Sequence, residues 1–188
     1  MVYVGSDDYD LYALDANTGA LVWKYPTSGI VVSSPAVVNG VVYFGSAYSD
    51  GQVCAVNAIT GTLLWKFQTG NSIYSSPAVT NGVVYVGSWD HNFYALNAST
   101  GGLVWKYTAN ANIGSSPTVA NGVVYFGSDL GGASTYALDA STGALLWENG
   151  AFTDFSAPAV ADGVVYVMSE NGFLLAFHLP DQSREQQK

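Results

Sequence analysis

Charged side chains, and basic ones above all, are scarce in this sequence, as are cysteine and histidine. Charged residues make up 10% of the 188 residues, and 5 bases stand against 14 acids, for a formal net charge of −9. Such a surface repels phosphate groups, so we expect neither nucleic-acid binding nor an anionic membrane as partner. No apolar run is long enough to insert into a bilayer, and Met1 to Ser6 lack the basic region of a signal peptide. The single cysteine, Cys54, excludes an internal disulfide.

An internal repeat dominates the chain. Trp23, Trp65, Trp105 and Trp147 are 42, 40 and 42 residues apart, and each ends an Ala-x-(Asp/Asn)-Ala-x-Thr-Gly-x-Leu-x-Trp segment. Two further motifs, Val-Tyr-(Val/Phe)-Gly-Ser and Ser-Ser-Pro, recur in the same phase, with altered last copies at 165–169 and 156–158. Repeats of about 40 residues are typical of propeller blades and other arrays of one supersecondary unit.

Each repeat is predicted to form four short antiparallel strands. In the second copy these strands cover 36–38, 41–45, 53–57 and 62–67. The Asn39-Gly40 pair between the first two is a strong hairpin signal. Four-stranded units of this length favour an all-β fold, a β-propeller of antiparallel blades. A β-sandwich is the second interpretation, but it does not account for a recurring tryptophan.

The repeated tryptophan is expected to lie on the outermost strand and to cover the neighbouring blade, because a large ring buries much apolar surface there. The turn glycine of the same motif supplies a positive φ. We therefore predict a structural, blade-docking role for these residues, which are Trp23, Trp65, Trp105 and Trp147 with Gly19, Gly61, Gly101 and Gly143.

The repeats are incomplete at both ends. The chain holds about 4.6 repeats of about 41 residues, or 18 strands, because the first unit lacks an inner strand and the last an outer one. We expect one propeller domain over residues 1–178 and a polar tail over 179–188. Three interpretations stay open: a five-bladed ring with imperfect closure, a piece of a larger propeller, or an arc that closes with another copy of itself.

The segment from Ala13 to Trp23 and its three copies resemble the tryptophan-docking motif of the PQQ-type (quinoprotein-like) propeller family. The resemblance implies an extracytoplasmic location and two kinds of relative. One is the quinoprotein dehydrogenases, which bind PQQ and Ca²⁺. The other is non-catalytic binding propellers, such as the lipoprotein of the outer-membrane β-barrel assembly machine. The dehydrogenases carry a vicinal cysteine pair near the quinone, whereas Cys54 stands alone and aligns with strand tyrosines, so we predict that it is a core residue.

Candidate site residues follow from comparing the repeats with one another. The fold does not fix the positions that differ between copies. These positions lie in two sets of loops, the loop between the second and third strands and the connection from the outer strand to the next blade, and both open on the same face of a propeller. The ligand- or partner-binding candidates are Tyr9, Tyr48, Trp89, Asp90, His91 and Phe152. Trp89 to His91 can also be read as a loop tip that packs on a neighbour. Asp7, Asp8 and Asp10 are weaker candidates for a hard cation, since their spacing does not match a calcium loop.

No catalytic residue is predicted. The sequence has no Gly-x-Ser-x-Gly segment and no Cys/His cluster. The expected function is a non-catalytic scaffold without a cofactor, which binds a protein or a small ligand on its loop face. The alternatives are a PQQ- and Ca²⁺-dependent dehydrogenase, or part of one, and a structural arc that associates with another copy of itself.

Overall fold

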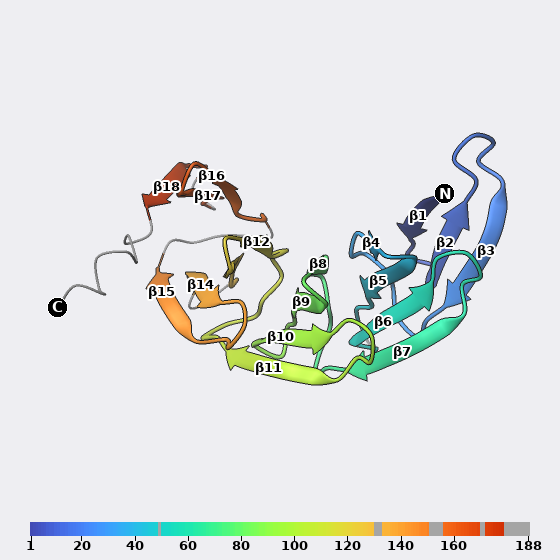
Figure 1. The fold of residues 1–188 in the computed structure, drawn as a ribbon, viewed down its shortest axis with the longest axis horizontal. Helices are drawn as coiled ribbons and strands as arrows, with labels where there is room; N and C mark the ends of the chain where they lie inside the picture. The colour runs from blue at the N-terminus through green and yellow to red at the C-terminus, as the bar shows by residue number, and fades with distance from the viewer. Residues whose placement is uncertain (49, 130–132, 151–155, 170–171, 179–188) are drawn as a thin grey trace.

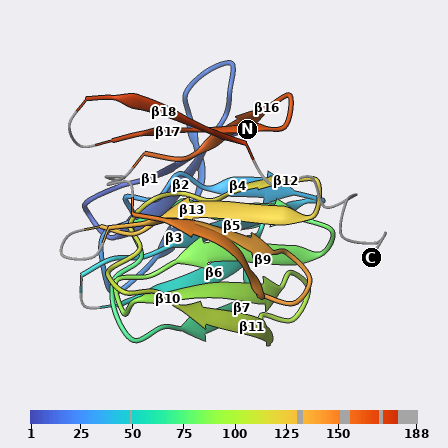
Figure 2. The ribbon, with the colours of Figure 1, turned by 90° about the vertical axis from the view of Figure 1, so that its left-hand side faces the viewer.

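The computed structural model is an open arc of five small antiparallel sheets (Figure 1). It describes residues 1–48, 50–129, 133–150, 156–169 and 172–178. These contain 18 strands and no helix, which confirms the all-β prediction and the strand count. The sheets stack side by side as propeller blades (Figures 1 and 2). The first and last sheets do not meet (Figure 1).

Each blade runs from an inner to an outer strand in chain order. Blade 1 has β1 (Val2–Gly5), β2 (Asp10–Leu14) and β3 (Leu21–Pro26). Blade 2 has β4 (Ala36–Val38), β5 (Val41–Gly45), β6 (Gln52–Asn57) and β7 (Leu63–Gln68). Blade 3 has β8 (Ala78–Thr80), β9 (Val83–Gly87), β10 (Asn92–Asn97) and β11 (Leu103–Thr108). Blade 4 has β12 (Thr118–Ala120), β13 (Val123–Gly127), β14 (Thr135–Asp139) and β15 (Leu145–Asn149). Blade 5 has β16 (Ala159–Ala161), β17 (Val164–Met168) and β18 (Leu174–His178).

Local turn chemistry explains the strand boundaries. Asn39 and Gly40 have φ values of 49° and 77°, and the same pattern recurs in the equivalent turns of blades 3, 4 and 5. A two-residue hairpin of type I′ requires positive φ at both positions, which asparagine and glycine tolerate best. The predicted strands of blade 2 are confirmed to within one residue at each end.

The Ser-Ser-Pro motif holds the inner strands. The Ser33 hydroxyl donates to the Gly45 carbonyl at 2.9 Å and accepts from the Gly45 N–H at 2.8 Å. The second serine links neighbouring blades, because Ser34 N–H donates to Ser76 Oγ at 2.8 Å and Ser76 N–H to Ser116 Oγ at 2.9 Å. The motif therefore fixes each inner strand to its own blade and to the next one.

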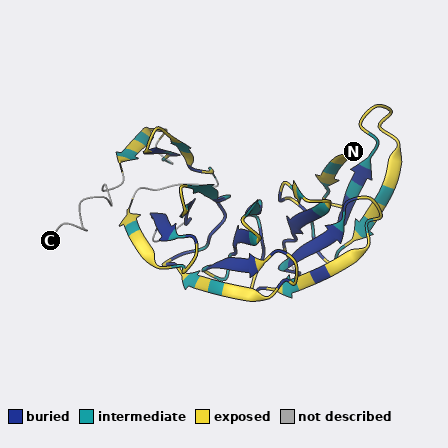
Figure 3. Ribbon diagram, viewed as in Figure 1, coloured by how far each residue is buried: buried dark blue, intermediate teal, exposed yellow. Residues whose placement is uncertain are grey.

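The core lies between the blades. Figure 3 shows the middle strands of blades 2 to 4 largely buried and the outer strands largely exposed. Cys54 belongs to the apolar cluster between blades 1 and 2, with Val42 and Phe44, and it is 1% exposed, which confirms its prediction as a core residue.

The repeated tryptophan spans each joint between described blades. Trp65 Nε1 donates to the Ala98 carbonyl at 2.9 Å, and Tyr43 donates its hydroxyl to the same carbonyl at 3.1 Å. A Cβ on Gly101 would lie 2.6 Å from the Trp65 ring, so only glycine leaves room for the ring. The same contacts join Trp23 to Ala58 and Gly61, and Trp105 to Ala140 and Gly143.

The two ends of the series differ from these three joints. Trp147 packs against Phe177 of blade 5, with ring centroids 4.8 Å apart. At the other end, a Cβ on Gly19 would meet no atom within 4 Å. The chain thus places three of the four repeated glycines beneath a tryptophan of the preceding blade.

Candidate functional site

The two variable sets of loops lie together at one end of the strands, as the repeat comparison predicts. Trp89 N–H donates to the Ser72 carbonyl at 3.0 Å, and Ala47 N–H donates to the Ile30 carbonyl at 2.8 Å. In both pairs, a loop between the second and third strands of a blade meets the segment that connects the preceding blade to it. We call this surface the loop face.

Asp90 ties two loops of this face together. Its carboxylate accepts from the Tyr94 hydroxyl at 2.6 Å and from the backbone N–H groups of Gly70 and Asn92 at 2.7 and 2.9 Å. Burial raises the pKa of Asp90, but the hydrogen bonds from Tyr94, Gly70 and Asn92 outweigh it, and the net pKa lies below the usual value of 3.8. The Asp50 carboxylate joins the equivalent loops of blades 1 and 2, because it accepts a hydrogen bond from Ser28 N–H at 3.1 Å.

The sequence comparison did not predict this structural role of Asp90, which links two loops of the loop face and which we call the loop tie. The signal in the sequence is an aspartate two residues before the third strand of blades 1, 2 and 3, at Asp8, Asp50 and Asp90. In the structure each of them precedes a residue with positive φ. A carboxylate at a repeated turn position is more readily explained by turn geometry than by a ligand.

Of the three aspartates proposed as cation ligands, Asp7 is exposed, and Asp8 and Asp10 contact other side chains. Asp8 accepts from the Tyr12 hydroxyl at 2.5 Å, and Asp10 forms an ion pair with Lys24 at 2.6 Å. Within the described ranges no group of three or more His, Cys, Asp and Glu side chains is arranged to hold a metal ion. Burial, with a smaller contribution from Asp50, raises the pKa of Cys54 to about 12. The acidic side chains of the described loops therefore form no cluster that could hold Ca²⁺.

An aromatic cluster forms where the loops of blades 2 and 3 meet. Trp89 packs on Tyr74 with ring centroids 4.4 Å apart and planes inclined by 42°, and Tyr74 meets Tyr48 edge-on at 6.3 Å. Tyr48 is 66% exposed, while Tyr74 and Trp89 are half-buried. The structure thus brings Tyr48 and Trp89 together through Tyr74, which the sequence reasoning did not identify.

The fold does not require aromatic rings at these positions. The residues equivalent to Trp89 in blades 1, 2 and 4 are Asp7, Ala47 and Asp129. Tyr74 corresponds to Val32, Gly114 and Phe155. Tyr48 also has a φ of 64°, a left-handed conformation that costs a non-glycine residue on the order of 1–3 kcal/mol. Trp89 is therefore the ring of the cluster that distinguishes this part of the arc from the other blades.

The other candidates lie apart from this cluster. Tyr9 and His91 are exposed loop residues with φ values of 73° and 69°. Tyr9 belongs to the loop of blade 1, whereas His91 directly follows Asp90 in blade 3. Phe152 lies outside the described residues.

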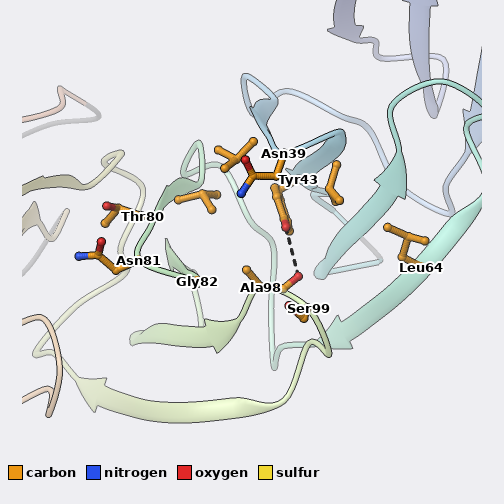
Figure 4. Close-up of a pocket in the computed structure, with 11 residues that line it drawn as sticks. Asn39, Tyr43, Leu64, Thr80, Asn81, Gly82, Ala98 and Ser99 are labelled. Atoms are coloured by element: carbon orange, nitrogen blue, oxygen red, sulfur yellow. Dashed lines mark hydrogen bonds between the residues drawn. The ribbon is translucent and has the colours of Figure 1, made fainter.

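The opposite end of the strands carries two equivalent grooves between blades. A cavity of about 500 Å³ separates blades 2 and 3 and is lined by Val38, Asn39, Tyr43, Asn81 and Ala98 among others (Figure 4). Its counterpart between blades 3 and 4 measures about 400 Å³ and uses the equivalent positions, such as Asn81, Tyr85 and Ala140. Tyr43 is the one ionisable residue lining the first groove, and its hydroxyl is bonded to Ala98, so the groove offers packing surface and no acid–base pair.

The family model of the outer membrane protein assembly factor BamB matches residues 1–77, 49–135 and 128–184. The chain belongs to the BamB family of PQQ-type repeats. No curated protein sequence is significantly similar to this BamB-family chain. Its described residues include no helix with the length and hydropathy of a membrane span.

Solved structures show the same fold at low sequence identity. BamB from Moraxella catarrhalis has a TM-score of 0.80 and 22% identity, over 94% of this chain and 57% of that one. The computationally designed proteins Ika8 and Ika4 have TM-scores of 0.82 and 0.71, each at 18% identity. The alignment covers 94% of this chain and 54% of Ika8, and 82% of this chain and 94% of Ika4. The BamB-family chain therefore spans little more than half the length of Moraxella BamB and Ika8.

Proposed function

We propose that this BamB-family chain is a non-catalytic propeller scaffold that binds a protein partner through its loop face. The observation that carries the proposal is the aromatic cluster of Tyr48, Tyr74 and Trp89, which the loops of two blades build together. Its tryptophan stands at a position where blades 1, 2 and 4 have Asp7, Ala47 and Asp129. Partly exposed aromatic rings on a rigid support are typical anchors of protein interfaces.

The size of the adjacent cavity favours a protein over a small molecule. The hollow beside Tyr48, lined by Asp50, Gln68 and Asn71 among others, measures about 120 Å³. Pockets for drug-sized ligands enclose about 300–1,000 Å³. A side chain of a partner fits the smaller volume, and the rest of the partner would then extend over the surrounding loops.

The charge of the loop face favours a basic partner segment. The loops between second and third strands carry Asp7, Asp8, Asp50, Asp90 and Asp129, whereas the described loop-face residues include no lysine or arginine. The bases of the described residues lie on the outer strands, at Lys24, Lys66 and Lys106. A guanidinium or ammonium group is attracted both by these carboxylates and by the face of an aromatic ring.

The family match supports a role in protein–protein interaction. The description of the family, an outer membrane protein assembly factor, also supports an extracytoplasmic location for this chain.

The experiment is site-specific photo-crosslinking in the cells that produce the chain. A benzoylphenylalanine replaces Tyr48 on the loop face or, as a matched control, Ile59, which is 77% exposed at the opposite end of the strands. We expect a discrete protein adduct from position 48 and not from position 59, and we expect Trp89→Ala to weaken it. Equal adducts from both positions would overturn the proposal, provided that circular dichroism shows the variants folded.

The dehydrogenase alternative is tested by an absorption spectrum. PQQ and Ca²⁺ are added to the purified chain, and the unbound quinone is removed by gel filtration. We expect the quinone to elute separately from the protein. Stoichiometric uptake would replace the non-catalytic proposal with the dehydrogenase.

A further inference from the structure

Blade 2 has a longer loop on the loop face than blades 1 and 3. In all three blades the serine after the second strand donates its N–H to the carbonyl of the first residue of the third strand, at 2.9 to 3.1 Å. Three residues lie between these two ends in blades 1 and 3, whereas five residues, 47–51, lie between them in blade 2. The longer loop carries Tyr48, which is 66% exposed. The loop of blade 4 is equally long in sequence, but it has no aromatic residue.

A hollow of about 120 Å³ lies between this loop and the segment that connects blade 2 to blade 3. Its lining residues are Tyr48, Asp50 and Gly51 on the loop and Gln68, Thr69, Gly70 and Asn71 on the connecting side. The residues that correspond to Gln68 in the other repeats with an outer strand are Pro26, Thr108 and Gly150. The hollow therefore depends on residues of blade 2 that the repeat does not require.

Two side-chain donors in the walls of the hollow are bonded within the protein. Gln68 Nε2 donates to the carbonyls of Asp50 and Thr69 at 2.6 and 3.0 Å. The Thr69 hydroxyl donates to the carbonyls of Gly51 and Asn71 at 2.6 and 2.7 Å. A carbonyl oxygen has two lone pairs, so the carbonyls of Asp50 and Thr69 can each accept a further hydrogen bond. The hollow is thus suited to a group that brings several donors.

Two carboxylates give the surroundings of the hollow a negative charge. The Asp50 side chain lies at its edge, where it accepts from Ser28 N–H and from the Ser46 hydroxyl at 3.1 and 3.0 Å. Asp90 accepts from the N–H of Gly70, which lines the hollow. Since the described residues of the loop face include no lysine or arginine, a cationic side chain of a partner is attracted to this place.

We propose, on the basis of the function proposed above, that the hollow beside Tyr48 binds the guanidinium group of an arginine in the protein partner. A guanidinium group is planar, carries five donors and stacks on aromatic rings. It can therefore cover the exposed Tyr48 ring while it donates to the carbonyl oxygens of the hollow. The ammonium group of lysine is a compact, strongly hydrated charge without a flat face, so it gains less from the ring.

The test is a titration of the isotope-labelled 188-residue chain with capped Gly-Gly-X-Gly-Gly peptides, followed through the NMR signals of the backbone amides. X is arginine, lysine or citrulline, which has the shape of arginine without its charge. We expect the arginine peptide to shift the signals of residues 50–51 and 68–71 saturably, with a Kd of roughly 1–10 mM for a single side chain. The lysine peptide should bind at least about fivefold more weakly, and the citrulline peptide should not saturate in this range.

Two variants locate the binding. Tyr48→Ala should abolish the saturable shifts. Tyr9→Ala is the matched control, because Tyr9 is 52% exposed on the loop of blade 1, also has a positive φ and directly follows Asp8. This variant should bind the arginine peptide as the unmodified chain does. The dispersion of the amide signals verifies that each variant is folded.

Four results would overturn the proposal. These are the lack of any saturable shift with the arginine peptide, equal Kd values for arginine and lysine, saturable binding of citrulline, and binding that persists in Tyr48→Ala. A protein adduct from position 48 without a preference for arginine would overturn the arginine site alone and leave the proposed function standing. Equal adducts from positions 48 and 59 would instead overturn the proposed function.

Discussion

Replacing Trp105 with alanine tests how much a single blade joint contributes to the free energy of unfolding. The Trp105 ring stacks on Phe93 with centroids 6.1 Å apart and lies next to Tyr85 at 5.9 Å. Its edge covers Gly143, and its Nε1 donates to the Ala140 carbonyl at 3.1 Å. Alanine removes all of these contacts and opens a cavity between blades 3 and 4.

The expected loss is roughly 3 kcal/mol or more, the lower end of what removing a large core aromatic costs. Most of it comes from the lost ring contacts. The Ala140 carbonyl keeps a partner, since the Tyr85 hydroxyl donates to it at 2.9 Å, so the penalty for an unpaired buried acceptor does not arise. Trp105→Phe should recover most of the packing and lose about 1 kcal/mol for the hydrogen bond.

The measurement is urea unfolding followed by far-ultraviolet circular dichroism, with both the midpoint and the slope compared. In repeat proteins stability is approximately a sum of unit and interface terms, so a changed slope would reveal separate unfolding of the two halves. Leu103→Ala on the same strand is the control, because Leu103 is 48% exposed and should change stability by less than about 0.5 kcal/mol. A loss under about 1 kcal/mol for Trp105→Ala would refute the docking role.

Three further predictions concern single residues. Gly143→Ala should lower the melting temperature more than Gly19→Ala at concentrations where the chain is monomeric. Both residues have φ near +72°, but only Gly143 lies against a tryptophan ring. Equal decreases in the melting temperature would contradict this account. Because the folded pKa of Asp90 lies below 3.8, its carboxylate contributes stability above that pH and loses it on acidification. Asp90→Asn should therefore flatten the acid limb of a pH–stability curve, and an unchanged limb would argue against the loop tie. Cys54, with a pKa of about 12, should resist iodoacetamide at pH 8 until urea unfolds the chain, so fast labelling of the native protein would contradict its burial.

The strands were predictable because their boundaries are local. Asn39-Gly40 can form only a few turn types, and the proline of Ser-Ser-Pro lacks the N–H that a central strand needs. Four copies of each signal in the same phase removed the ambiguity that a single short apolar run has. The lone Cys54 was placed in the core by the same comparison, since its equivalents in other copies are strand residues.

Tyr74 was missed because its importance depends on another loop. Nothing near it in the sequence indicates that its ring lies 4.4 Å from Trp89, which follows the next hairpin. Asp90 was ranked as a ligand candidate for the same reason, as its partner Gly70 N–H belongs to a segment 20 residues away. Residues that contact a loop of the neighbouring blade are identified only when the positions of both loops are known.

The sequence by itself determined the all-β architecture, the repeat and the number of strands, since these follow from turn residues and from a motif that recurs about every 41 residues. Only the tertiary structure decided which of the repeated turn glycines are covered by a tryptophan ring. The same position of the repeated motif is occupied by glycine in all four copies. Gly61, Gly101 and Gly143 lie under a tryptophan ring, whereas Gly19 faces open space. The physical reason is that the glycine belongs to one blade and the tryptophan that covers it to the preceding blade. Whether a tryptophan covers the glycine therefore depends on how the blades are arranged in space.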